Sequence, residues 1–283
     1  MRILFIGDIV GTPGVSFLER ALPCLVAREA IDLVVANAEN AVTGSGLTPG
    51  VYRKLLKAGV AAVTLGDHIY KKQEIIPTLQ EDERLCKPAN YPPDAPGKEF
   101  VIVPARDGTA VAVFCLLGRT YMRPVDCPFR AADRVLERIA AQARCILVDV
   151  HAEATADKYL LGHYLKGRVS AVLGTHTHVQ TADEQILAGG TAFISDVGMT
   201  GPYDSILGRR IDRVLSTTVN FVPSQFEVAT GDPRLAAALV DVDPVTGRAS
   251  AIRRVMLAEA DMAQMENLEQ PAQMESLEPS SGR

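Results

Sequence analysis

The sequence predicts an α/β fold in which helices cover the faces of a β-sheet. Over its first two thirds, the chain of 283 residues alternates short β-branched runs with helical stretches, which is typical of such folds. Between residues 191 and 256 nearly all candidate elements are strands, and no linker precedes them. We therefore expect a single domain over residues 1–258, in which the late strands form a second sheet on the same core.

The expected strands are short runs rich in valine, isoleucine and leucine. In chain order they cover residues 2–7, 32–36, 60–65, 99–103, 111–117, 145–150 and 169–174, followed by 192–194, 225–228, 236–242 and 249–255. Helices are expected between the early strands, over residues 15–29, 49–57, 71–81, 131–143 and 156–166. Four prolines between residues 87 and 97 exclude regular structure there and indicate a loop.

The last residues differ in composition from the rest of the chain. Residues 259–283 hold six acidic side chains and one basic residue, Arg283, which predicts an acidic C-terminal tail. Two interpretations stay open. The tail is a solvated segment with short helical pieces, or it docks on a partner subunit through Met265, Leu268, Met274 and Leu277. A homo-oligomer is therefore left open as well.

Composition excludes several classes of protein. The net charge of −5 disfavours generic nucleic-acid binding by a basic surface, and an aromatic content of 5% without tryptophan weakens any base-stacking platform. No apolar run reaches the ~20 residues of a membrane span, so no membrane partner is expected. The first segment is typical of a strand and not of a signal peptide, and the five scattered cysteines form no CxxC pair. Both features indicate a cytoplasmic protein with reduced thiols.

Candidate metal-site residues follow the expected strands at their carboxyl ends. They are Asp8, Glu39, Asn40, Asp67, His68, His151, His176 and His178. Four of the five histidines of the chain fall at such ends, where open α/β sheets bind their ligands. Each residue alone has a structural interpretation, such as a helix cap for Asp8 or a buried core histidine for His68. Together they predict a metal site, since His176 and His178 alternate in an expected extended segment and project to one side.

Other motifs keep a structural interpretation. The stretch Gly44-Ser45-Gly46 lacks the strand–helix frame and the third glycine of a dinucleotide fingerprint. His163 lies within an expected helix and is interpreted as structural. No nucleophile elbow supports a Ser–His–Asp triad.

The order of the candidate ligands resembles that of the calcineurin-like metallophosphoesterases. Their usual pattern is DxH, GDxxD, GNH[DE], a lone histidine and GHxH. Here Asp8-Ile9-Val10 lacks the first histidine, and Ala38-Glu39-Asn40 replaces GDxxD. These departures, together with the stretches at residues 37–41, 151–155, 174–183 and 196–202, are similar to the YmdB-like phosphodiesterases. The similarity covers residues 1–256 and does not reach the acidic tail.

The resemblance implies a four-layer αββα sandwich of two mixed sheets. It also implies a centre of two divalent or trivalent transition-metal ions, with iron first and manganese or zinc as alternatives. One metal would be held by Asp8, Glu39, Asn40 and His178. The other would share Glu39 as a bridge and take Asp67, His151 and His176. A hydroxide between the metals would attack a small phosphodiester, such as 2′,3′-cyclic AMP, with His68 as the general acid.

Asp67 departs from the family pattern, which has an asparagine at this place. With two divalent ions and one hydroxide, the carboxylates of Asp8, Glu39 and Asp67 make the site neutral. An asparagine would leave one positive charge. We therefore expect Asp67 to strengthen metal retention and to weaken the attraction to an anionic phosphate.

Two other functions stay open. One is a phosphomonoesterase or nuclease with the same site, because the substrate-selecting loops at residues 85–97 and 119–130 carry no recognisable motif. Candidate aromatics for base recognition are Tyr70, Tyr121 and Phe129. The other function is a low-turnover regulatory protein that binds metal and acts through partners, which Asp67 and the acidic tail favour.

Overall fold

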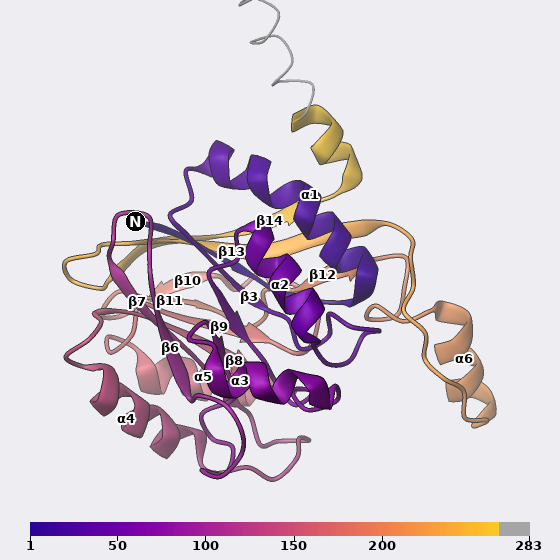
Figure 1. Ribbon diagram of the computed structural model, residues 1–283, viewed down its shortest axis with the longest axis horizontal. Helices are drawn as coiled ribbons and strands as arrows, with labels where there is room; N and C mark the ends of the chain where they lie inside the picture. Colours follow the sequence, from indigo (N-terminus) through magenta and orange to yellow (C-terminus); the bar gives the residue numbers. More distant parts are fainter. Residues whose placement is uncertain (266–283) are drawn as a thin grey trace, which may run out of the picture.

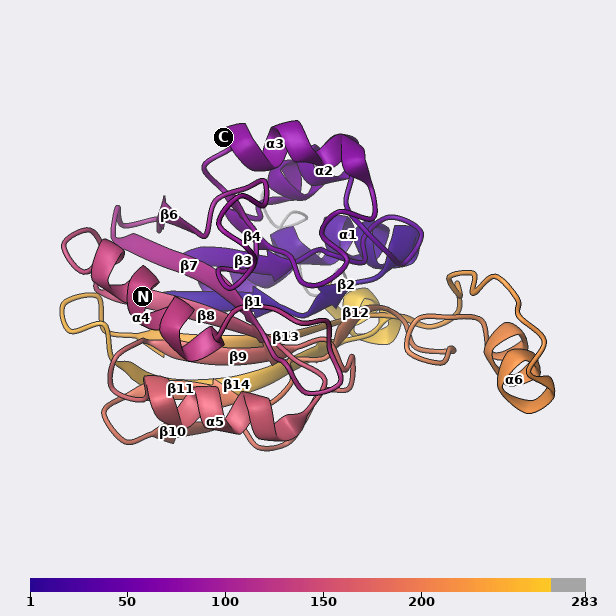
Figure 2. The same ribbon diagram turned by 90° about the horizontal axis from the view of Figure 1, so that it is seen from below.

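The computed structural model describes residues 1–265, which form two mixed β-sheets with helices on both outer sides (Figure 1 and Figure 2). Within these residues the first sheet has eight strands, in the order β2 (Asp8–Ile9), β12 (Met199–Pro202), β13 (Pro233–Val242), β1 (Arg2–Ile6), β3 (Leu33–Asn37), β4 (Ala62–Thr64) and β5 (Leu85–Cys86), with β14 (Ala249–Leu257) paired to β13. The second sheet, within the same residues, has six strands: β10 (Gln185–Leu187), β11 (Thr191–Ile194), β9 (Ala171–Thr175), β8 (Cys145–His151), β7 (Ala110–Leu117) and β6 (Phe100–Pro104).

The alternation of side chains along β1 shows how the layers are separated. Ile3 and Phe5 pack into the core between the two sheets. Leu4 and Ile6 point to the opposite face, where they pack into the core under the helices of the first sheet. Because a strand presents alternate residues to opposite faces, a wholly buried run of this kind serves two cores at once.

Helices cover the outer face of each sheet. The first sheet is covered by α1 (Gly11–Glu29), α2 (Pro49–Ala58) and α3 (Ile76–Glu81), which follows the short 3-10 helix η1 (Gln73–Ile75). The second is covered by α4 (Pro128–Ile139) and α5 (Thr155–Leu165). In α2 the side chain of Thr48 accepts the N–H of Val51, and Gly59 ends the helix at φ 112°, a left-handed conformation that glycine adopts without strain. The expected four-layer αββα architecture is thereby confirmed.

The early elements lie close to their expected ranges, and the differences are concentrated after residue 191. The late strands do not form a sheet of their own, because β11 joins the second sheet and β12, β13 and β14 join the first. The expected strand at 225–228 is wrong, since only Val228 makes an isolated bridge there, to Arg209. The helix α6 (Ile211–Asn220) was not expected at all. The loop at residues 87–97 is confirmed as irregular.

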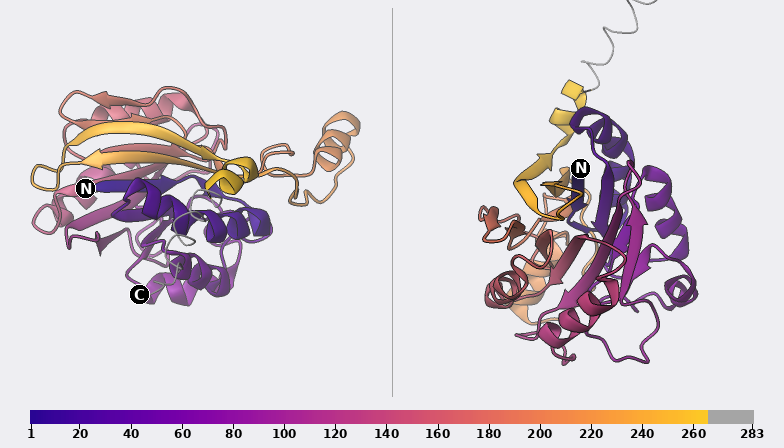
Figure 3. Two further views of the ribbon diagram at one scale, coloured as in Figure 1. Left: turned by 90° about the horizontal axis from the view of Figure 1, so that it is seen from above. Right: turned by 90° about the vertical axis from the view of Figure 1, so that its left-hand side faces the viewer.

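Residues 203–232, which we call the arm, connect β12 to β13 and carry α6. The arm projects away from the layered body, as the orange segment at one end of the molecule shows (Figure 2 and Figure 3). None of the residues of α6 is buried. The arm is therefore held by contacts at its root and not by a core of its own.

The expected tail begins within the described part of the chain. Residues 259–265 are helical, Met262 and Met265 are buried against the core under α1, and Glu259 pairs with Arg20 at 2.6 Å. The remaining tail residues, among them Leu268, Met274 and Leu277, lie outside the described residues. Within residues 1–265, no helix has both the length and the apolar character needed to cross a lipid bilayer.

Candidate metal centre

The eight residues expected at the site come together where the carboxyl ends of parallel strands from both sheets meet. Strands β1, β3 and β4 run parallel in the first sheet, and β8 and β9 run parallel in the second. Asp8 lies in β2, Glu39 and Asn40 follow β3, Asp67 and His68 follow β4, His151 ends β8, and His176 and His178 follow β9. Residues from five separate segments thus share one edge of the sandwich.

One group of possible ligands consists of Glu39, Asp67, His151 and His176. One ligand atom from each lies within 4.8 Å of the others. The Nε2 atom of His151 lies 3.2 Å from Glu39 Oε1 and 3.4 Å from Asp67 Oδ1. The same Nε2 atom lies 3.0 Å from His176 Nδ1. Carboxylate oxygens and imidazole nitrogens that converge in this way can hold a manganese, iron or zinc ion.

A second group consists of Asp8, Asn40 and His178. The Nε2 atom of His178 lies 3.8 Å from Asp8 Oδ1 and 3.3 Å from Asn40 Nδ2. Asn40 Nδ2 also lies 3.2 Å from Glu39 Oε1, which places Glu39 between the two groups. The oxygen and nitrogen of an amide are told apart only by their hydrogen bonds. A half-turn of the Asn40 amide therefore presents an oxygen, a metal ligand, to the second group.

The burial of charge in this centre fits a bound cation. Asp8 and Glu39 have no exposed surface, and Asp67 Oδ1 is buried without a hydrogen-bond partner. Buried carboxylates are costly unless a cation or hydrogen bonds compensate them. Burial raises the pKa of Asp8 to about 6, which shows how strongly the surroundings oppose its negative charge. A metal ion would remove this penalty, so the residues fit the implied metals.

The pKa values of the two histidines of the first group, His151 and His176, are shifted in opposite directions. Burial, followed by the repulsion of His151, lowers the pKa of His176 to about 4. Burial also disfavours the charged form of His151, but Glu39 and Asp67 outweigh it and raise the pKa of His151 well above its usual value. A proton on His151 thus supplies the positive charge that a metal would supply, and metal binding must displace that proton.

Buried neighbours fix the ring of His151. Thr175 Oγ1 donates to Asp149 Oδ1 at 2.6 Å, and Thr64 Oγ1 donates to Asp149 Oδ2 at 2.6 Å. Because the hydroxyl proton of Thr175 is used in this way, His151 Nδ1, 2.8 Å from Thr175 Oγ1, must be the donor there. When His151 is neutral, its Nε2 atom then presents a lone pair to the first group, as a metal ligand does.

The segment of His176 and His178 is strained and anchored. Their φ angles are 90° and 63°, values that residues other than glycine rarely adopt, so the expected extended conformation is wrong here. Thr177 between them donates from Oγ1 to Asp196 Oδ2 at 2.6 Å and from its backbone N–H at 3.1 Å. Lys158 Nζ donates to the same Asp196 oxygen at 2.8 Å and to Thr177 Oγ1 at 2.9 Å. This buried ion pair holds the strained backbone in place.

His68 lies beside both groups. Its backbone N–H donates to Glu39 Oε2 at 3.0 Å, and its Nδ1 lies 2.7 Å from Asn40 Oδ1. The His68 ring also lines two cavities, of about 310 and 300 Å³. Among the expected base-recognising aromatics, Tyr70 lines the smaller of these cavities. Tyr121 is exposed to solvent, and Phe129 packs edge-on against Tyr164.

The sequence analysis missed the residues that support the ligands. They are Asn37, Thr64, Asp149, Lys158, Thr175, Thr177 and Asp196. Their common signal is a polar or charged side chain within or next to an apolar run, such as Asp149 in β8. Such a residue is costly to bury without a partner, so its presence predicts a polar neighbour. The identity of that neighbour requires the fold.

Comparison with known proteins identifies the family. The chain matches the model of the YmdB-like protein family over residues 4–255. It is 43% identical, over 262 residues, to the 2′,3′-cyclic-nucleotide 2′-phosphodiesterase of Bacillus subtilis (strain 168), a match that covers 93% of this chain and 99% of the relative. A putative phosphatase/phosphodiesterase of Mycoplasma pneumoniae is 29% identical over 92% of this chain and 94% of the relative. The chain belongs to the YmdB-like family, which confirms the resemblance seen in its ligand order.

Solved structures agree with this assignment. A hypothetical protein from Thermus thermophilus superposes with a TM-score of 0.86 at 44% identity, over 92% of this chain and all of that chain. A novel phosphatase from Mycoplasma pneumoniae superposes with a TM-score of 0.85 at 27% identity, over 91% of this chain and 93% of that one. The fold is therefore that of the calcineurin-like phosphoesterases.

Proposed function

We propose that this chain is a dinuclear, metal-dependent phosphodiesterase that hydrolyses 2′,3′-cyclic nucleotides. The observation that carries the proposal is the position of Glu39 Oε1, 3.2 Å from His151 Nε2 in one ligand group and 3.2 Å from Asn40 Nδ2 in the other. A carboxylate between two ligand groups suits a ligand shared by two metals. The 43% identity to a cyclic-nucleotide phosphodiesterase supports the choice of substrate.

Each metal would have its own ligands besides Glu39. Asp67, His151 and His176 would hold one ion, and Asp8, Asn40 and His178 would hold the other. When bound, such ions supply an activated water and offset the charge of the phosphoryl oxygens. The mixture of carboxylate, amide and imidazole ligands suits iron, manganese and zinc alike.

His68, with Asn40 beside it, is placed to protonate the leaving group. The His68 Nδ1 atom lies 2.7 Å from the side-chain amide of Asn40, so Nε2 is the ring nitrogen left for the substrate. As the P–O2′ bond breaks, the ribose O2′ needs a proton. Protonated His68 would donate this proton from Nε2 and end as the neutral imidazole. The product is a nucleoside 3′-phosphate.

Two cations lie on one side of the site. Lys71 and Arg123 line the cavity of about 300 Å³ together with Asp67 and His68. Arg123 is held in place by Tyr91, whose hydroxyl oxygen accepts from Arg123 Nη1 at 3.3 Å. Because Asp67 adds a negative charge to the centre, these cations help to maintain attraction to an anionic phosphodiester.

Elemental analysis joined to a turnover assay tests the proposal. The purified protein would be offered 2′,3′-cyclic AMP, a cyclic dinucleotide, a phosphomonoester and a bis-aryl phosphodiester. We expect two transition-metal ions per chain and the highest kcat/KM for 2′,3′-cyclic AMP. A higher kcat/KM for the phosphomonoester would instead indicate a phosphatase, which is one of the two activities in the name of the Mycoplasma relative. Full metal occupancy without turnover of any substrate would favour the regulatory alternative.

A further inference from the structure

The two cavities that His68 lines differ in chemistry. The first, of about 310 Å³, lies between the metal centre and the arm. The second, of about 300 Å³, carries the cations Lys71 and Arg123. A substrate whose phosphate lies at His68 therefore meets an apolar surface on one side and a charged surface on the other. The first cavity has a volume within the range of small-molecule sites, roughly 300–1,000 Å³.

The arm supplies the apolar wall of the first cavity. Leu207, Val214 and Phe226 line it, together with Val10 and Ile206. Leu207 and Phe226 are 51% and 41% exposed, which is unusual for large apolar side chains beside a polar centre. Apolar surface left open next to convergent polar groups is typical of a ligand site.

Arg209 lines the same cavity, and three of its five N–H donors are bound to backbone carbonyls. Its Nη1 donates to the carbonyls of Thr43 and Phe226, both at 3.0 Å, and its Nη2 donates to the carbonyl of Gly44. A Cβ at Gly44 would collide with this guanidinium, so the glycine makes room for it. Arg209 thus fastens the arm to the body through backbone carbonyls. The apolar side chains beside it suit an uncharged, flat group.

We propose that this wall binds the nucleobase of the cyclic nucleotide, with Phe226 as its stacking surface. The inference rests on the proposed function, because it requires the cyclic phosphate to lie between the metal ligands and His68. The base is attached at C1′, next to the C2′ that carries the phosphate, so it must lie beside the reacting group. The first cavity holds both kinds of residue, since His178 and Phe226 line it together.

The aromatics of the second cavity are poorly placed for the same task. Tyr70 donates its hydroxyl to the carbonyl of Pro96 at 2.6 Å, and its ring lies 6.0 Å from that of Tyr91. The guanidinium of Arg123 lies 5.9 Å from the centre of the Tyr91 ring. These rings are engaged with one another and with a cation, whereas Phe226 presents an open surface.

The arm also contacts the metal centre directly. The carbonyl of Leu207 lies 3.2 Å from His178 Nδ1 and can accept a hydrogen bond from it, which would leave His178 Nε2 for the metal. Leu207 has a φ of 50°, a strained value for a leucine. One segment of the arm thus orients a ligand and carries part of the apolar wall.

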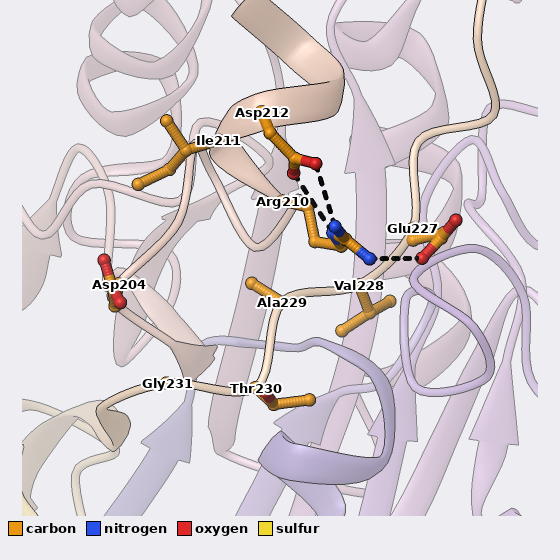
Figure 4. Close-up of a pocket in the computed structure, with 9 residues that line it drawn as sticks. All are labelled: Asp204, Arg210, Ile211, Asp212, Glu227, Val228, Ala229, Thr230 and Gly231. Atoms are coloured by element: carbon orange, nitrogen blue, oxygen red, sulfur yellow. Dashed lines mark hydrogen bonds and ion pairs between the residues drawn. The ribbon is translucent and has the colours of Figure 1, made fainter.

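The larger cavity at the root of the arm, of about 650 Å³, does not compete for this role (Figure 4). Figure 4 shows Arg210 between Asp212 and Glu227, to which it donates at 2.8 and 3.0 Å. The charges of Arg210, Asp212 and Glu227 are thus paired with one another, whereas Asp204 stands apart from them, and none of the expected metal ligands lines the cavity.

Phe226→Ala and Phe221→Ala form a matched test. Phe221 is 87% exposed on the same arm and does not line the cavity. The substrates are 2′,3′-cyclic AMP and the 2′,3′-cyclic phosphate of methyl riboside, which has no base. We expect Phe226→Ala to raise KM for cyclic AMP about five- to hundredfold, the usual effect of losing a base–aromatic stack. KM for the baseless substrate and metal content should stay unchanged, Phe226→Tyr should retain the wild-type KM, and Phe221→Ala should change nothing.

Other outcomes separate the two proposals. Equal effects of Phe226→Ala on both substrates, or none on either, would overturn the base site while leaving the phosphodiesterase intact. A fully loaded wild-type protein that hydrolyses neither substrate would overturn the proposed function. In that case, saturation-transfer NMR with adenosine still tests the base site. Binding that is lost in Phe226→Ala and kept in Phe221→Ala would support it, and equal binding by both would overturn it.

Discussion

The metal centre and the arm differ in how the chain holds them. The ligands of the centre stand at the ends of strands, and the supporting Asp149 and Asp196 are fully buried. The arm has a helix without a single buried residue and is fastened to the body by Arg209, which donates to the carbonyls of Thr43 and Gly44. The difference teaches that the groups proposed to hold a metal are placed on the rigid core, whereas the wall proposed to bind the base stands on a less anchored segment. Changes in the centre should therefore alter metal content or kcat, and changes in the arm should alter KM.

The largest effect should come from removing a ligand histidine. His176→Ala and His178→Ala should each remove about one of two ions, from opposite groups, and should lower kcat/KM by at least about 10²-fold. His163→Ala is the matched control, because His163 is exposed on α5, away from the centre. Elemental analysis and EPR of the manganese-loaded protein measure the result. A loss of the same ion in both variants, or an equal loss in His163→Ala, would contradict two separate groups.

His68→Ala should keep the metals and lose the acid. Its backbone N–H still donates to Glu39, so Glu39, the proposed bridge, stays in place. We expect kcat for 2′,3′-cyclic AMP to fall on the order of 10²–10⁴-fold, as for a lost general acid. A nitrophenyl ester should suffer much less, since its leaving group needs no proton. Parallel loss of metal, or equal loss with both substrates, would show that His68 is not the acid.

The clustering of the candidate ligands could be predicted from the sequence because its signals are local. An apolar run marks each strand, and the polar residue that ends the run lies at a fixed edge of a parallel sheet. What the sequence did not show is the support behind each ligand. Asp149 stands out within the apolar β8, but its partners Thr64 and Thr175 come from other strands, so the pairing depends on the fold.

The arm was not predicted, although part of it carries a helical signal. In helix α6 the apolar residues Ile211, Val214, Leu215 and Val219 recur at helical spacing, yet none of them is buried. Residues 225–228 carry β-compatible side chains, yet they find no neighbouring strand beyond one bridge. Strand β12 has no strand signal in the sequence, because glycine and proline fill half of its four positions.

Thr177→Val should weaken the centre without removing a ligand. The substitution removes the hydroxyl that donates to Asp196 and accepts from Lys158, so the strained segment of His176 and His178 is released. We expect metal affinity to fall about 10- to 100-fold, the usual effect of losing a residue behind a ligand. Thr177→Ser keeps the hydroxyl and should retain affinity. Equal affinities in the two variants, measured by competition with a chelator, would show that Thr177 does not position the ligands.

The smallest effect should come from Asp67→Asn, which changes one charge and leaves the shape of the side chain unchanged. The buried Asp67 Oδ1 has no hydrogen-bond partner and lies 3.4 Å from His151 Nε2. Losing the negative charge should weaken metal retention about tenfold and, with metal in excess, raise kcat/KM by a similar or smaller factor, because the anionic substrate meets less repulsion. Chelator titration and steady-state kinetics on the same sample measure both changes. His151 and His176 should still hold the ion, so the variant should remain dinuclear under excess metal. Tighter retention together with an unchanged or lower kcat/KM would mean that Asp67 is not a ligand, and that the negative charge at this place does not act on the metals.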